Sequence, residues 1–208
     1  MEMTACVILG YLSGSVLYAR IFARIFHREK ALECSKDGNP GTANAFLYGG
    51  FWCGTLTLIC DLGKGFLPVF LFARHGIWSA GGAFSHTLIS GLALAAPVIG
   101  HAFPLFYGFQ GGKGIATTFG CLLGLAPMWQ PFGALAAFFL LFSIVLRITP
   151  HYHRTLFAYV CCLLVILCTA QNAAVKTGFL MIASTVCIRL FASREQREKV
   201  GVKLLWMH

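Results

Sequence analysis

The chain has 208 residues, of which 58% are hydrophobic and only 11% are charged, and this balance excludes an ordinary soluble domain. The formal net charge is +9, but the basic residues fall between apolar segments, where no soluble module could present them to nucleic acid. Composition therefore predicts an all-α, polytopic integral membrane bundle that binds no nucleic acid. No stretch has the composition of a linker, so we expect a single domain over residues 1–208.

Seven apolar segments have about the length that a membrane-spanning helix needs. They cover approximately residues 3–26, 51–73, 80–99, 115–128, 132–148, 156–169 and 177–191. The fourth, sixth and seventh are short for complete spans, so six spans is the alternative. We predict about seven transmembrane helices, the first of them from about residue 3 to residue 26.

The distribution of basic residues predicts the orientation of this bundle. If the N-terminus is outside, only Arg74 and Lys176 of the 16 lysines and arginines fall in external gaps, and Lys64 lies within a span. Cytoplasmic loops of membrane proteins carry an excess of Lys and Arg. We therefore expect a multi-pass protein of the inner (plasma) membrane with its N-terminus outside and its C-terminus in the cytoplasm. The loops after the first and third spans then share the cytoplasmic side.

The first span and the loop after it hold the first candidate site residues. The span contains a small polar patch, for which close helix packing and a ligand-facing role are the two alternatives; it consists of Gly10, Ser13, Gly14 and Ser15. The loop contains the sequence Gly38-Asn39-Pro40-Gly41-Thr42-Ala43-Asn44. A Gly-Asn-x-Gly run can form a concave backbone nest whose N–H groups bind an anion, and a simple turn is the alternative.

The second span carries two ionisable side chains, Asp61 and Lys64, followed by Gly65. Ionisable residues inside a span are rare and indicate function by default. A spacing of three places Asp61 and Lys64 on one helical face, so a structural ion pair is the alternative.

The loop after the third span is the most unusual part of the sequence. Between Gly100 and Gly114 it holds an imidazole, an amide, a lysine and a run of glycines, although apolar segments flank it on both sides. Glycines let a backbone approach a ligand and present its N–H groups, and Lys113 adds a positive charge beside them. This chemistry predicts a site for phosphate or another compact anion.

These elements, in this order, resemble the integral-membrane acyl-phosphate:glycerol-3-phosphate acyltransferases, the PlsY family. The likeness extends from Gly14 to about Thr117. Its most specific part is Gly100-His101-x-Phe103-Pro104-x-Phe106-x-x-Phe109-x-Gly111-Gly112-Lys113-Gly114-Ile115-Ala116-Thr117. The elements Gly14-Ser15, Gly38-Asn39-x-Gly41-x-x-Asn44 and Asp61-x-x-Lys64-Gly65 are similar to further family elements.

The resemblance implies transfer of a fatty acyl group from acyl-phosphate to the sn-1 hydroxyl of glycerol 3-phosphate, which yields lysophosphatidate for phospholipid biosynthesis. The expected partners are these two substrates and membrane lipids, without a cofactor, a metal or an obligatory protein partner. The resemblance implies catalytic roles for His101, Ser15 and Asn44. It implies phosphate or substrate binding by Asn39, Gly41, Lys64, Gly111, Gly112, Lys113 and Gly114.

Several positions differ from the family pattern and leave two alternatives open. Glu33 and Leu47 fall where the family has basic residues, which would suit a non-catalytic anion-binding or transport relative. Asp37 and Pro40 in the first loop would suit an enzyme of the same fold with another phosphorylated acceptor. The family's C-terminal element, with its asparagine and arginine, is not recognisable in residues 189–203.

Overall fold

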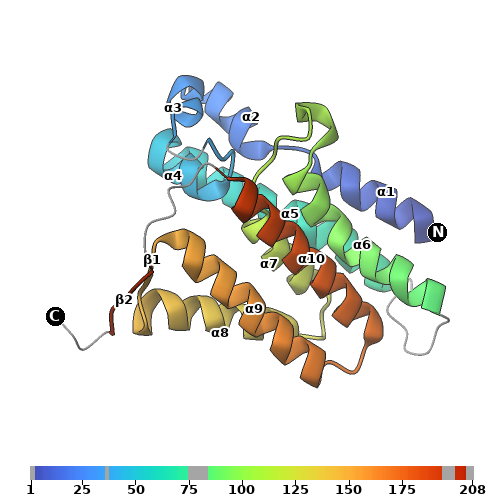
Figure 1. Ribbon diagram of the computed structural model, residues 1–208. Helices are drawn as coiled ribbons and strands as arrows, with labels where there is room; N and C mark the ends of the chain where they lie inside the picture. The colour runs from blue at the N-terminus through green and yellow to red at the C-terminus, as the bar shows by residue number, and fades with distance from the viewer. Residues whose placement is uncertain (1–2, 36–37, 75–83, 194–199, 205–208) are drawn as a thin grey trace.

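The computed structural model describes residues 3–35, 38–74, 84–193 and 200–204, and within these ranges the protein is almost entirely helical (Figure 1). Asp37 therefore lies outside the described residues. The helices are α1 (Met3–Gly14), α2 (Tyr18–Ile25), α3 (Glu29–Glu33), α4 (Thr42–Gly49), α5 (Phe51–Arg74), α6 (Phe84–Ala102), the 3₁₀ turn η1 (Leu105–Tyr107), α7 (Ile115–Gly124), α8 (Gln130–Leu140), the π-helical turn η2 (Leu141–Val145), α9 (His151–Thr169) and α10 (Ala173–Ala192).

The described helices include five spans that are long and apolar enough to cross a membrane. These spans are Met3–Ile25, Phe51–Arg74, His86–Tyr107, His151–Thr169 and Ala173–Ala192, whereas Ile115–Gly124 and Gln130–Val145 are apolar but shorter. The prediction of a helical membrane bundle is confirmed, and the count of seven spans stays a prediction. Two spans expected to be short are full-length, because α9 already begins at His151 and α10 at Ala173.

The first span, predicted over about residues 3–26, is not a single continuous helix. α1 ends at Gly14 and α2 begins at Tyr18, and the residues between them leave the helical path. One consequence of this break is that the backbone carbonyl of Val16 accepts a hydrogen bond of 2.7 Å from the Lys64 ammonium. The interruption thus supplies a polar group for a lysine that α5 carries inside the bundle.

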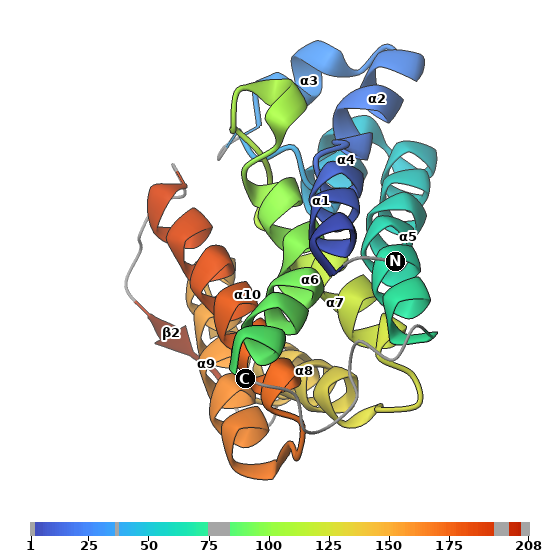
Figure 2. The same ribbon diagram turned by 90° about the vertical axis from the view of Figure 1, so that its right-hand side faces the viewer.

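α6 occupies the centre of the bundle, with α1 against one side and α10 against another (Figure 2). The α1–α6 crossing is close because glycines replace side chains at the contact. A Cβ atom on Gly14 would overlap the backbone of Pro97, and one on Gly100 would overlap the carbonyl of Tyr11. Small residues allow such backbone contact in membrane bundles. The crossing fixes the end of α1 beside the end of α6, next to His101.

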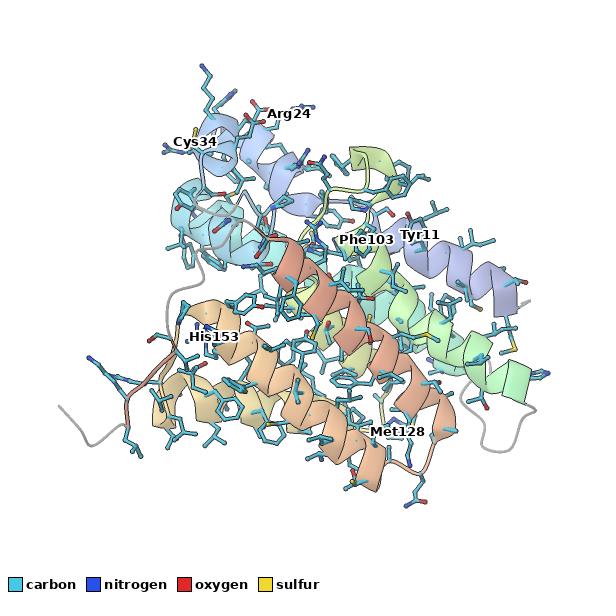
Figure 3. All side chains as sticks on the ribbon, viewed as in Figure 1. Tyr11, Arg24, Cys34, Phe103, Met128 and His153 are labelled. Atoms are coloured by element: carbon cyan, nitrogen blue, oxygen red, sulfur yellow. The ribbon has the colours of Figure 1, made fainter. Side chains whose placement is uncertain are left out.

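The loops with polar motifs gather at one end of the bundle. Figure 1 shows α2, α3, α4, the 103–114 loop and the end of α10 near one another, while the N-terminus and the α9–α10 connection lie at the opposite end. The side chains labelled in Figure 3 follow the same division, with Cys34 at one end and Met128 towards the other. After α10, strand β2 (Gly201–Val202) pairs antiparallel with β1 (Ile148–Thr149).

Candidate active site

A cleft with a volume of about 400 Å³ lies among these gathered loops. Its lining comes from α2, the loop before α4, the loop before α7 and the end of α10, so segments distant in the sequence share it. The lining residues are Arg20, Gly38, Asn39, Pro40, Gln110, Gly111, Lys113, Arg189, Ala192 and Ser193.

The cleft is lined by three basic side chains, and the described residues that line it include no acidic one. Lys113 is 9% exposed, the Arg189 side chain is partly buried, and Arg20 is exposed. Positive charges gathered in a concave surface raise the local concentration of anions. The cleft therefore suits a compact anion, as the loop chemistry predicted.

Arg189 is held in place at the last turn of α10 by two groups of the 103–114 loop. Its guanidinium donates a hydrogen bond to the carbonyl of Gly111, and its Cζ atom lies 5.6 Å from the centroid of the Phe103 ring. Both contacts restrict the side chain before any ligand arrives. Arg189 is thus a preorganised cation, which lowers the entropy cost of binding an anion.

The loop that carries Asn39 into the cleft is organised by Asn44. The Asn44 amide donates to the Ser35 hydroxyl at 3.1 Å and to the Asn39 carbonyl at 2.9 Å. The Gly41 N–H donates to the same carbonyl at 2.8 Å. Asn44 and Gly41 are not among the lining residues, and their geometry favours a positioning role over the direct substrate contact expected from the sequence.

The glycine run before α7 packs its loop against the end of α6. The N–H groups of Gly111 and Gly112 donate to the carbonyls of Ala102 and His101, at 3.2 and 3.0 Å, so both amides complete hydrogen bonds at the end of α6. A Cβ atom on Gly112 would overlap the His101 imidazole, and Gly114 has a φ of +77°. The glycines let the loop pass directly against α6 and place Lys113 in the cleft, and phosphate binding by Gly111, Gly112 and Gly114 stays a prediction.

His101, Lys64 and Asp61 form a buried network next to the cleft rather than on its surface. The Lys64 ammonium lies 2.8 Å from Asp61 Oδ1, 2.8 Å from His101 Nδ1 and 2.7 Å from the Val16 carbonyl. The side chains of Lys64 and Asp61 are 2% and 1% exposed. The predicted ion pair is present, but Lys64 does not line the cleft as the second phosphate-binding cation.

The network also determines which nitrogen of His101 carries the proton. A lysine ammonium has three N–H donors and no acceptor, and here three acceptors lie at hydrogen-bonding distance. Because Nδ1 accepts from Lys64, the neutral imidazole carries its proton on Nε2. A Cβ atom on Gly112 would lie against this Nε2, so the ring presents a donor to the turn beside Lys113.

Ser15 is fully buried, and its hydroxyl both donates and accepts a hydrogen bond inside the protein. The hydroxyl donates to the Tyr11 carbonyl at 2.9 Å and accepts from the Leu105 N–H at 3.3 Å. The Tyr11 hydroxyl donates to the Phe103 carbonyl at 2.9 Å, and Figure 3 shows these two residues side by side. Ser15 and Tyr11 together anchor the start of the 103–114 loop, so Ser15 has a positioning geometry.

Of the predicted residues, the structure brings Asn39, Gly111 and Lys113 to one cleft, with His101 directly behind it. The two arginines of the cleft were missed, because we counted Arg20 and Arg189 only as markers of orientation. Each is an ionisable residue within an expected apolar segment, residues 3–26 for Arg20 and 177–191 for Arg189, which is the signal that could have identified them. Within the described ranges, no group of three or more His, Cys, Asp or Glu side chains could hold a metal ion.

Comparison with known families gives a match over nearly the whole chain. Residues 4–200 match the family described as glycerol-3-phosphate acyltransferase. The chain is 35% identical over 193 residues to the glycerol-3-phosphate acyltransferase of Shewanella halifaxensis (strain HAW-EB4), which covers 92% of this chain and 84% of that protein. It is 42% identical over 120 residues to the enzyme of that name from Pseudomonas paraeruginosa (strain DSM 24068 / PA7), with 58% of this chain and only 59% of the relative covered.

Two solved structures share the fold. One is a crystal structure of PlsY (YgiH), an integral membrane glycerol 3-phosphate acyltransferase, in its glycerol 3-phosphate form, with a TM-score of 0.72 and 25% sequence identity. The other is the lysophosphatidic acid form, with a TM-score of 0.67. Each alignment covers 90% of this chain and 87% of the solved one. The chain therefore belongs to the glycerol-3-phosphate acyltransferase family of integral membrane proteins.

Proposed function

We propose that this protein transfers a fatty acyl group from acyl-phosphate to the sn-1 hydroxyl of glycerol 3-phosphate. The observation that carries the proposal is the cleft lined by Arg20, Lys113 and Arg189 at one end of a membrane bundle of this family. Both substrates carry phosphate, and one of them also carries an acyl chain that belongs in lipid. A cationic cleft at the end of an apolar bundle accommodates both kinds of group.

The chemistry needs no covalent nucleophile, because acyl-phosphate is already an activated mixed anhydride. The acceptor hydroxyl oxygen bonds to the carbonyl carbon, the bond from that carbon to the phosphate oxygen breaks, and phosphate leaves with the electron pair. The hydroxyl proton ends on the phosphate product. The protein must therefore hold two anions together and stabilise the charge that develops on the carbonyl and phosphate oxygens.

Some of these residues contact the substrates, and others hold the contacting residues in position. Lys113 binds phosphate in the cleft, and the Asn39 amide adds a hydrogen-bonding group at its wall. His101 donates from Nε2 to a developing anionic oxygen, with Lys64 fixing the ring through Nδ1. Ser15 and Asn44 position the loops that carry these groups.

We place the cleft on the cytoplasmic side of the inner membrane. The basic residues support this orientation, since Arg20, Lys113 and Arg189 lie at the end that the excess of Lys and Arg assigns to the cytoplasm. Glycerol 3-phosphate then enters from the cytoplasm and the acyl chain from the surrounding lipid. The proposal includes no cofactor and no obligatory protein partner.

The decisive assay uses purified protein with palmitoyl-phosphate and labelled glycerol 3-phosphate, and it follows the formation of lysophosphatidate. We expect product with palmitoyl-phosphate and none when palmitoyl-CoA replaces it. Product only with a different phospho-alcohol would identify an enzyme with another acceptor. The absence of product with every acceptor would contradict the proposal and favour a non-catalytic anion-binding relative.

Lys113→Ala is expected to lower the rate of transfer by roughly a hundredfold or more, as removal of one charge-stabilising group does in other enzymes. The control is Lys176→Ala, which removes the same charge from the first turn of α10, at the opposite end of the bundle. Both variants should insert into membranes in equal amounts. Full activity of Lys113→Ala in the palmitoyl-phosphate assay would refute the assignment.

A further inference from the structure

We propose that Arg20 binds the phosphate of the water-soluble acceptor at the mouth of the cleft, an inference that rests on the proposed acyl transfer. Arg20 lies on the first turn of α2, outside the sequence elements that resemble the family. It nevertheless lines the same cleft as Lys113 and Arg189. The break between α1 and α2 turns this part of the first span towards the 103–114 loop and so brings the arginine to the cleft.

The Arg20 side chain is supported by the aromatic ring of Tyr107. Its Cζ atom lies 5.2 Å from the centroid of the Tyr107 ring, in the turn η1. A cation over an aromatic face is held by the ring quadrupole while its N–H groups stay available at the edge. Among the described residues, no carboxylate pairs with Arg20. The guanidinium is therefore directed to the cleft without an internal counter-charge.

The neighbouring arginine on the same helix shows what an ordinary surface position looks like here. Arg24 pairs with Glu29 through an Nε–Oε1 distance of 2.9 Å, its side chain is 83% exposed, and it does not line the cleft. The two arginines are four positions apart on α2 and differ in charge partner and in access to the cleft. Of these two arginines, Arg20 has the geometry of a ligand-binding residue.

The basic side chains of the cleft differ in how deeply they are buried, and this difference indicates different roles. Lys113 is almost completely buried and lies beside His101, where the reacting groups must meet. Arg20, which comes from α2, is exposed where it lines the cleft. Glycerol 3-phosphate arrives from water, and its phosphate lies at the end of the molecule away from the attacking hydroxyl. A planar guanidinium at the mouth suits this non-reacting phosphate, which two parallel N–H groups can bind.

The experiment compares Arg20→Gln with Arg24→Gln in the palmitoyl-phosphate assay. Loss of a charge-assisted contact to phosphate should raise the KM for glycerol 3-phosphate about tenfold or more in Arg20→Gln. The KM for palmitoyl-phosphate should stay within about twofold, and Arg24→Gln should match the unaltered protein. Arg20→Lys keeps the charge but not the pair of parallel N–H donors. Its KM for glycerol 3-phosphate should therefore lie between that of the unaltered protein and that of Arg20→Gln. If Arg20→Gln folds poorly, the KM of Arg20→Lys for glycerol 3-phosphate tests the inference in its place.

An unchanged KM for glycerol 3-phosphate in Arg20→Gln, or an equal rise in both KM values, would overturn the inference. Failure of the proposed function is distinguishable, because it would appear as absence of product in the unaltered protein. In that case, calorimetric titration with glycerol 3-phosphate tests phosphate binding by Arg20 without depending on catalysis. About tenfold weaker binding to Arg20→Gln than to Arg24→Gln supports the assignment, and equal affinities or no binding to the unaltered protein refute it.

Discussion

The ammonium group of Lys64 has three hydrogens, and three acceptors lie within 2.8 Å of its nitrogen: the Asp61 carboxylate, the His101 ring and the Val16 carbonyl. The Asp61 carboxylate also accepts from the Thr42 hydroxyl at 3.2 Å, which links α4 to α5. A buried ion pair contributes little net stability by itself, because desolvation of both charges offsets their attraction. Its value here is that it fixes the orientation of His101.

Replacement of Lys64 by Met should reveal this dependence. The substitution leaves the Asp61 carboxylate buried without its counter-charge, and we expect it to lower the free energy of unfolding by about 3–5 kcal/mol. The double variant Asp61→Asn/Lys64→Met should recover much of that loss, since no unpaired charge remains. Reversible unfolding in mixed micelles measures both values. A single variant as stable as the unaltered protein would show that the pair is not structurally coupled.

Individual site residues differ in how far the sequence predicted them. The Asp61–Lys64 pair was predictable from its spacing on one helix, and Lys113 from the chemistry of its loop. Arg20 and Arg189 were not, because the direction of α2 and the packing of α10 against α6 bring them to the cleft. Leu47, where we expected a family cation, is 76% exposed, while the cleft still holds three basic residues.

At the scale of helices, the contact between α5 and α7 depends on glycines in the same way as the contact between α1 and α6. A Cβ atom on Gly65 would overlap the carbonyl of Thr117, and one on Gly120 would overlap that of Leu62. This crossing lies directly beside Lys64 and the start of α7, the helix that follows Lys113. The glycine of the Asp61-x-x-Lys64-Gly65 element therefore has a packing function.

Two glycines of α5 offer a matched test of this packing. Gly65→Ala should destabilise the protein by roughly 1–3 kcal/mol, because the two backbones must separate to admit a methyl group. Gly63→Ala should be neutral or stabilise by up to about 1 kcal/mol, since a Cβ atom there meets no atom within 4 Å. Apparent melting temperatures in detergent give the comparison. Equal shifts for the two variants would contradict the close crossing.

The break in the first span could not be predicted from hydrophobicity, because Val16 and Leu17 are apolar and a small polar residue such as Ser15 also occurs within continuous membrane helices. The contacts made at the break are tertiary, since the Ser15 hydroxyl and the Val16 carbonyl bind groups on η1 and α5, and a hydropathy pattern does not contain them. The same limit applies to helix ends. α9 includes polar residues from His151 onwards that a hydropathy pattern assigns to a loop.

For the whole molecule, composition was enough to predict a helical membrane bundle, and the alternation of apolar segments predicted which loops share an end. Which helices pack against each other could not be predicted from the sequence, because no periodic pattern indicates that α6 packs against both α1 and α10. The proposed orientation, with the cleft in the cytoplasm, depends on the positive-inside rule and is open to direct measurement.

Membrane-impermeant maleimide labelling should test that orientation. Cys34 is exposed at the end that holds the cleft, so we expect labelling in inverted vesicles and none in intact cells. A Gln171→Cys variant places a thiol in the α9–α10 connection at the opposite end and should give the reverse pattern. Mass spectrometry assigns each label to its peptide. Labelling of Cys34 from outside intact cells would reverse the orientation.

A crystal structure of the protein with glycerol 3-phosphate tests the central claim most directly, because it locates the phosphate relative to the three cations. We predict that the phosphate contacts Arg20 at the mouth of the cleft and that the sn-1 hydroxyl points towards His101 and Lys113. Glycerol 3-phosphate bound away from this cleft, or with its phosphate out of reach of Arg20, Lys113 and Arg189, would contradict the account.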